Sequence, residues 1–139
     1  MKTFLLELTE LSILVNEVSQ NFKNGVVILK GDLASGKTTF VKEIAKKLGL
    51  KDEVTSPTFS LQHCYSGNIY HYDIYNQGLA HFISLGMLEE LDKLGLHFVE
   101  WGDDELVDIL SSAGIKVLTI EIKKVSDIAR EYKVDYAHA

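Results

Sequence analysis

Residues 31–38 constrain the fold of this chain more than any other stretch. They read Gly-Asp-Leu-Ala-Ser-Gly-Lys-Thr and fit the pattern G-x-x-x-x-G-K-[ST]. The unbroken apolar run 26–29 before them is typical of a strand that is buried on both faces. Gly49 stands where a helix C-cap belongs, after apolar residues at helical spacing: Phe40, Val41, Ile44, Ala45 and Leu48. The order of strand, glycine loop and helix predicts a loop that binds phosphate groups.

The residue types in this loop suit that chemistry. Gly31 and Gly36 permit backbone conformations that a side chain would disfavour, so successive N–H groups can turn toward a phosphate. We expect Lys37 to reach the β- and γ-phosphates of a nucleotide and the Thr38 hydroxyl to bind Mg²⁺. The alternative is a strand–helix turn without a ligand, which the matching flanks disfavour. The nucleotide-binding residues expected here are Asp32, Leu33, Ala34, Ser35, Gly36, Lys37, Thr38 and Thr39.

Length and composition limit the remaining possibilities. The 139 residues fit one domain spanning residues 1–139. A net charge of −6 argues against direct binding of nucleic acid through a basic surface. No stretch is apolar for long enough to span a membrane. Cys64 is the only cysteine, so the chain has no disulfide partner for it, and we expect a cytoplasmic protein.

Two acidic residues stand at the ends of expected strands. Asp73 falls near the end of the segment 69–75, where alternation puts His71 and Asp73 on one face. Glu100 directly ends an apolar strand. We expect both carboxylates to lie beside Mg²⁺, although Asp73 could instead be a turn former and Glu100 could orient the attacking water. The predicted catalytic residues are Lys37, Asp73 and Glu100, and the predicted metal ligands are Thr38, Glu100 and Asp73.

Other residues with possible chemistry give weaker signals. Trp101 follows Glu100 and is either a half-buried core aromatic or part of a binding surface. The segment Ser56-Pro57-Thr58 is either an ordinary loop or a switch whose hydroxyls, on Ser56 and Thr58, face the γ-phosphate. Four histidines without metal-ligand spacing are expected to be ordinary surface or core residues: His63, His81, His97 and His138.

Local patterns predict the elements around the loop. Thr9 is expected to cap a helix, and Asp103 to cap a later one. The segments 59–65 and 69–75 flank a turn at 66–68, which predicts an antiparallel hairpin beside an otherwise parallel sheet. One helix face is indicated by Leu85, Leu88, Leu91 and Leu94, and strands are expected at 3–8, 117–122 and 131–136. The predicted fold class is α/β, a three-layer P-loop NTPase domain with a mixed, mostly parallel central sheet.

Three classes of protein share the P-loop. A regulatory GTPase would carry a guanine-reading N-K-x-D after a strand, and this chain has none. A small-molecule kinase would need arginines to clamp its phosphorylated substrates, and Arg130 is the only arginine among the 14 basic residues. The kinase is therefore the weakest hypothesis. A minimal ATPase that gates a partner remains, with a nucleotide-occupancy module of little turnover as its alternative.

Four motifs together resemble the bacterial TsaE (YjeE) family. They are Gly-Asp-Leu-Ala-Ser-Gly-Lys-Thr-Thr-Phe (31–40), Ser-Pro-Thr-Phe (56–59), His-Tyr-Asp-Ile-Tyr (71–75) and Val-Glu-Trp (99–101). The match follows nearly the whole chain in order. The family's ATPases are needed for threonylcarbamoyl modification of the adenosine beside the anticodon in tRNA.

This resemblance implies a function and adds site residues. It implies slow ATP hydrolysis with Mg²⁺ and docking onto a TsaD–TsaB pair that handles the tRNA, so that tRNA is only an indirect partner. It places Arg130 at the nucleotide, Thr9 and Glu10 near the base, and Trp101 at the active-site or partner rim. Two departures stand out. Ala34-Ser35 replaces the family's usual Gly-Ala, and Asn76 stands where the family commonly has an arginine.

Overall fold

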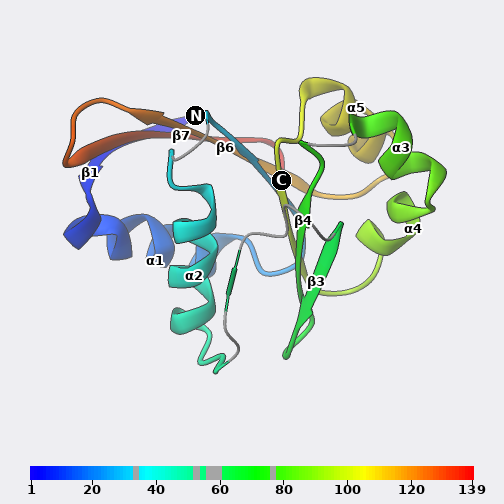
Figure 1. Cartoon of the computed structure of the whole chain (residues 1–139), viewed down its shortest axis with the longest axis horizontal. Helices are drawn as coiled ribbons and strands as arrows, with labels where there is room; N and C mark the ends of the chain where they lie inside the picture. The colour runs from blue at the N-terminus through cyan, green and yellow to red at the C-terminus, as the bar shows by residue number, and fades with distance from the viewer. Residues whose placement is uncertain (33–34, 52–53, 56–60, 76–77) are drawn as a thin grey trace.

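The computed structural model describes residues 1–32, 35–51, 54–55, 61–75 and 78–139. One seven-stranded sheet runs through the middle, in the order β1-β7-β6-β2-β5-β4-β3. The strands are β1 (Lys2–Glu7), β2 (Gly25–Lys30), β3 (Gln62–Tyr65), β4 (Ile69–Asp73), β5 (Leu96–Glu100), β6 (Val117–Lys124) and β7 (Ala129–His138). Figure 1 shows the sheet with helices on both sides.

Parallel pairing occupies the centre of the sheet and antiparallel pairing its two edges. Strand β2 pairs in parallel with β5 and β6, and β5 pairs in parallel with β4. At the edges, β3 is antiparallel to β4, as predicted for a hairpin, and β7 is antiparallel to both β6 and β1. Strand β1 therefore runs in the same direction as β6, and the predicted mixed, mostly parallel sheet is confirmed.

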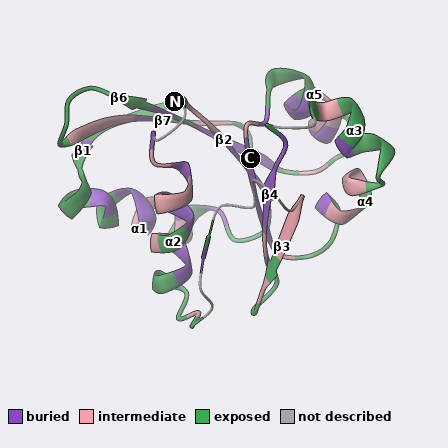
Figure 2. Ribbon diagram, in the orientation of Figure 1, coloured by how far each residue is buried: buried purple, intermediate pink, exposed green. Residues whose placement is uncertain are grey.

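The helices form the two outer layers. Helices α1 (Leu11–Asn21) and α2 (Lys37–Lys47) cover one face, and α3 (Gly78–Ser84), α4 (Met87–Leu91) and α5 (Asp104–Ser112) cover the other (Figure 1). Each face has its own apolar cluster. Val27 and Leu29 of β2 belong to the cluster under α1 and α2, and Val26 and Ile28 belong to the opposite one. Strand β2 is buried over residues 25–29 (Figure 2), and this burial on both faces explains the unbroken apolar run 26–29.

Several local predictions are confirmed. The Asp103 side chain accepts a hydrogen bond from the Leu106 N–H at 2.9 Å and caps α5. Helix α2 ends at Lys47 with Leu48 as its C-cap, and Gly49 follows with a φ of +78°, as a glycine after a C-cap should. Within the described residues, no helix is long and apolar enough to cross a membrane.

Two local predictions are wrong. Helix α1 takes Glu10 as its N-cap, not Thr9, because the Glu10 carboxylate already accepts the Glu7 N–H at 3.0 Å across the short 3-10 turn η1 (Leu8–Glu10). The leucines at 85, 88, 91 and 94 do not share one helix face. Gly86, with a φ of +75°, separates α3 from α4, and both Leu85 and Leu94 are exposed.

Candidate nucleotide-binding site

The loop between β2 and α2 depends on its two glycines. Gly31 has a φ of +153°, and a Cβ atom there would lie 2.5 Å from Ser35 Oγ and 2.6 Å from the Ile122 carbonyl oxygen. Gly36 has a φ of +112° and forms the N-cap of α2, with open space where a Cβ would be. Both positions therefore favour glycine, the first for space and conformation and the second for conformation alone.

Lys37 folds back over this loop. Its Nζ donates hydrogen bonds to the carbonyl oxygens of Gly31 at 2.7 Å and Asp32 at 2.9 Å. The same Nζ lies 4.0 Å from the centroid of the Trp101 ring. Burial lowers the pKa of Lys37, and the negative charges of Glu100, Asp73 and Asp32 partly offset that effect. The buried ammonium group of Lys37 therefore lies where the sequence predicts the phosphates of a nucleotide.

Thr38 and Glu100 meet beside Lys37. The Thr38 hydroxyl, in the first turn of α2, donates to Glu100 Oε2 at 2.8 Å. Glu100 ends β5 and pairs in register with Asp73 at the end of the neighbouring strand β4. Both acidic residues are buried. The carboxyl ends of parallel strands meet at one edge of a sheet, and this is where α/β proteins bind ligands.

These oxygens suit Mg²⁺. Among the described residues, no group of three or more His, Cys, Asp and Glu side chains could hold a metal ion by itself. Mg²⁺ differs from zinc in needing no such group, because it is usually held by one or two carboxylates together with water and substrate phosphates. The Thr38 hydroxyl with the Glu100 and Asp73 carboxylates fits that type of site.

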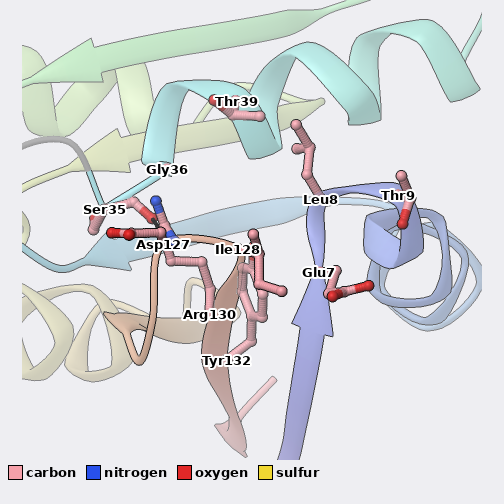
Figure 3. A pocket seen from close by; sticks show the side chains of 10 residues that line it. All are labelled: Glu7, Leu8, Thr9, Ser35, Gly36, Thr39, Asp127, Ile128, Arg130 and Tyr132. Carbon is pink, nitrogen blue, oxygen red and sulfur yellow. Dashed lines mark hydrogen bonds between the residues drawn. The ribbon is translucent and has the colours of Figure 1, made fainter.

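A cavity of about 490 Å³ opens on the other side of Gly36. Segments far apart in the chain line it: the β1–η1 corner, the P-loop, α2, and the residues that begin β7. In Figure 3, Ser35 and Arg130 lie on one side of the cavity and Leu8 and Thr9 on the other. Its lining residues are Glu7, Leu8, Thr9, Ser35, Gly36, Thr39, Asp127, Ile128, Arg130 and Tyr132.

Comparison with known proteins identifies the family. The family model described as "Threonylcarbamoyl adenosine biosynthesis protein TsaE" matches residues 6–132. The chain belongs to the TsaE family. Members of this family take part in the biosynthesis of threonylcarbamoyladenosine in tRNA.

Individual relatives agree. The chain is 37% identical over 115 residues to TsaE of Treponema pallidum, covering 81% of this chain and 82% of that protein. It is 41% identical over 91 residues to TsaE of Rickettsia typhi, a match that spans 61% of this chain and 62% of the relative. The crystal structure of Bacillus subtilis YdiB superposes with a TM-score of 0.71 at 26% identity, over 98% of this chain and 87% of that one.

Most of the site residues predicted from the sequence come together. Lys37, Thr38, Asp73, Glu100 and Trp101 gather at the edge of the sheet where β2, β4 and β5 end. Ser35, Gly36, Thr39, Thr9 and Arg130 line the neighbouring cavity. Asp32 joins the P-loop through its carbonyl contact with Lys37. The expected residues Leu33, Ala34, Ser56 and Thr58, and the departure at Asn76, lie outside the described residues.

Three expected residues have roles that the sequence did not specify. The Arg130 Nε donates to the Ser35 carbonyl oxygen at 3.1 Å, so Arg130 ties β7 to the P-loop. The Glu10 carboxylate accepts the Glu7 N–H, while Glu7 itself lines the cavity. Trp101 has a φ of +68°, rare for an aromatic residue, and its ring lies 4.5 Å from that of Tyr75.

Three further residues of this site were not expected from the sequence. Leu8 and Ile128 are exposed hydrophobic residues on the cavity wall, brought together by the pairing of β1 with β7. His71 contacts Glu100, with its Nε2 2.5 Å from Oε2. The alternation that put His71 on the same face as Asp73 was the one available signal for that contact.

Proposed function

We propose that this chain is the ATPase subunit of the tRNA-modifying assembly in which TsaE proteins work. It binds ATP with Mg²⁺, hydrolyses it slowly alone, and acts on a TsaD–TsaB pair that transfers the threonylcarbamoyl group. The chain itself does not handle the tRNA chemically. Membership of the TsaE family supports the pathway, and the geometry of the P-loop supports the ATPase activity.

The observation that carries the proposal is the meeting of Thr38 and Glu100 beside Lys37. A helix-start hydroxyl hydrogen-bonded to a strand-end carboxylate at 2.8 Å places two oxygen ligands together. A buried ammonium group lies next to them. A Mg²⁺-bound triphosphate supplies both charges that this arrangement lacks: a cation for the carboxylate and phosphate oxygens for the ammonium.

Nucleotide binding requires Lys37 to change partners. Its Nζ currently donates to the carbonyl oxygens of Gly31 and Asp32, which are neutral acceptors. A phosphate oxygen is a charged acceptor, and charge-assisted hydrogen bonds are roughly twice as strong as neutral ones. We therefore expect Lys37 to turn from these carbonyls toward the β- and γ-phosphates when ATP binds.

The cavity beside Gly36 is our proposed site for the base and ribose. It adjoins the N-terminus of α2, where the phosphates would lie. Leu8 and Ile128 offer apolar contacts to the faces of a planar base, and Thr9 and Glu7 offer polar contacts to its edge. Arg130, which also lines the cavity, offers a positive charge to the phosphates on this side of the loop.

The hydrolysis itself is a displacement at the γ-phosphorus. A water oxygen bonds to that phosphorus, the bond to the β–γ bridging oxygen breaks, and ADP, phosphate and a proton leave. Mg²⁺ would neutralise charge on the phosphate oxygens. Glu100 orients the water or holds the cation, Lys37 stabilises the negative charge on the phosphates, and Asp73 adds a carboxylate beside Glu100.

The test is ATP hydrolysis by the purified chain, with and without TsaD–TsaB, using Lys37→Ala as the blank. Strong stimulation by the partners that is lost in Lys37→Ala supports a partner-gated ATPase. Tight ATP binding with no turnover in either condition supports the occupancy module instead. Absence of ATP binding would refute both.

A further inference from the structure

The Glu100 carboxylate belongs to a row of hydrogen bonds that crosses two neighbouring strands. Thr38 Oγ1 lies 2.8 Å from Glu100 Oε2, and His71 Nε2 lies 2.5 Å from the same oxygen. On the far side of the ring, the Tyr65 hydroxyl lies 3.2 Å from His71 Nδ1. His71 is fully buried. The row therefore links the first turn of α2 to the edge strand β3.

The chemistry of these groups gives each hydrogen bond a direction. An ionised carboxylate only accepts, so His71 Nε2 carries a hydrogen and donates it to Glu100. In a neutral imidazole the other ring nitrogen then accepts. The Tyr65 hydroxyl has one hydrogen to donate, and among the described residues three acceptors lie near it: His71 Nδ1 at 3.2 Å, and the Thr55 carbonyl oxygen and His63 Nδ1 at 3.4 Å each. His71 Nδ1 is the nearest of the three, so we assign the donated hydrogen to it. Tyr65 thereby favours the tautomer of His71 that presents its N–H group to Glu100.

The sheet register places these side chains. Strand β4 pairs with β5 so that His71 stands opposite Phe98 and Asp73 opposite Glu100. His71 is thus the diagonal neighbour of Glu100 on the face that α2 covers, within reach of a ring-bearing side chain. Side chains held by paired strands are positioned more precisely than side chains held by loops.

Thr38 and His71 differ in what they can do for a cation. The hydroxyl oxygen of Thr38 is a ligand of the kind that Mg²⁺ takes, so this residue has another use for its oxygen. The N–H group of His71 cannot bind a cation. In the described part of the chain, Glu100 Oε1 receives no hydrogen bond, and its direction is set by the anchoring of Oε2.

We propose that His71 is a positioning residue for Glu100 and that Tyr65 holds the His71 ring in place. The pair aims the Glu100 carboxylate at the Mg²⁺–nucleotide site. This inference rests on the proposed function. Partners that orient a metal ligand from outside its own shell typically change metal affinity or activity by about 10- to 100-fold when removed.

Three variants and one control test this role. His71→Leu fills a similar volume without a donor, His71→Gln restores an N–H donor, and Tyr65→Phe removes only the hydroxyl. The matched control is Tyr72→Phe, which removes a buried tyrosine hydroxyl that contacts His97. Each variant is measured for thermal unfolding, for binding of a fluorescent ATP analogue in EDTA and over a Mg²⁺ titration, and for ATP hydrolysis.

We expect His71→Leu to bind the analogue in EDTA as the wild type does. Its half-saturating Mg²⁺ concentration should rise, and its kcat should fall, by about tenfold or more with KM changed less. His71→Gln should recover most of both losses. Tyr65→Phe should show a shift of about two- to tenfold in the same direction and decides the question if His71→Leu does not fold. Tyr72→Phe should lower only the unfolding temperature.

Different results would overturn the proposed function and the positioning role of His71. If the wild type shows neither Mg²⁺-dependent ATP binding nor hydrolysis, the proposed function fails and the inference falls with it. If the wild type shows both and a folded His71→Leu and Tyr65→Phe match it, the positioning role is refuted and the proposed function stands. The positioning role is also refuted if Tyr72→Phe raises the half-saturating Mg²⁺ concentration as much as His71→Leu does. It is refuted as well if His71→Gln recovers neither Mg²⁺ dependence nor kcat.

Discussion

The ammonium group of Lys37 lies 4.0 Å from the centroid of the Trp101 ring, within the range of a cation–π contact. Trp101 is the only tryptophan of the chain. Lys37, which is expected to bind phosphate, therefore contacts Trp101, which dominates the intrinsic fluorescence of the chain.

This contact predicts a change of tryptophan emission on nucleotide binding. Lys37 must leave the carbonyls of Gly31 and Asp32 to reach a phosphate, and its distance from the Trp101 ring changes with it. Titration of ATP and Mg²⁺ into the purified chain should shift the emission saturably. Lys37→Met should show altered emission without nucleotide and little response at the ATP concentrations that saturate the wild type. An identical response in that variant would contradict the account.

Removing the Lys37 charge should separate binding from folding. Lys37→Met keeps the aliphatic stem, and because burial lowers the pKa of Lys37, the variant should unfold at the same or a higher urea concentration. Its affinity for ATP should fall by roughly 10- to 100-fold, since a hydrogen bond to a charged group contributes about 1.5–3 kcal/mol. The matched control is Lys42→Met, an exposed lysine of the same helix, which should bind normally.

The two loop glycines should respond differently to alanine. At Gly31 a Cβ would meet the Ile122 carbonyl oxygen, which belongs to a paired strand and cannot rotate away. Backbone strain and crowding each cost about 1–3 kcal/mol. Both costs apply to Gly31→Ala, so its free energy of unfolding should fall by the sum of the two. Gly36→Ala has open space and should lose only the strain term. Equal losses in urea unfolding would show that the space around Gly31 is not limiting.

A buried histidine should make the fold sensitive to acid. His97 Nδ1 lies 2.7 Å from the Tyr72 hydroxyl, its Nε2 lies 2.7 Å from the Lys93 carbonyl oxygen, and burial lowers the pKa of His97 below the usual 6.5. Below pH 6.5, His97 therefore binds a proton in the unfolded chain but stays neutral in the folded chain until the pH reaches its lowered pKa. Stability present above pH 6.5 should be lost as the pH falls toward the lowered pKa, by at most about 1.4 kcal/mol per pH unit.

The variant His97→Gln tests whether His97 causes this loss of stability in acid. The variant lacks the titrating ring, so its free energy of unfolding should change less between pH 7 and pH 5 than that of the wild type. Parallel pH profiles for the two proteins would assign the acid sensitivity to other groups.

The parts of the site that depend on neighbouring residues could be predicted from the sequence. The buried strand β2, the two glycines and the start of α2 at Lys37 follow from patterns within about 20 residues. The carboxylates at positions 73 and 100 were expected at strand ends, and parallel pairing explains why those ends meet.

The missed features depend on pairing between distant segments. Leu8 and Ile128 share a cavity only because β1 and β7 pair, and His71 reaches Glu100 only through the β4–β5 register. The wrong helix cap has a different reason. Thr9 is a good capping residue by type, but Glu10 is bonded to the preceding turn and begins the helix instead.

The central claim is that this chain hydrolyses ATP to drive its modifying partners. The most direct measurement is the amount of threonylcarbamoyladenosine formed over many turnovers with TsaD–TsaB and tRNA, comparing wild type, Lys37→Ala and Glu100→Gln. Of the three proteins, we predict that only the wild type sustains modification. Glu100→Gln should still bind ATP, but its rate of ATP hydrolysis should fall by about 100-fold or more. Full modification with Glu100→Gln would show that occupancy suffices, and full modification with Lys37→Ala would contradict any role for the P-loop.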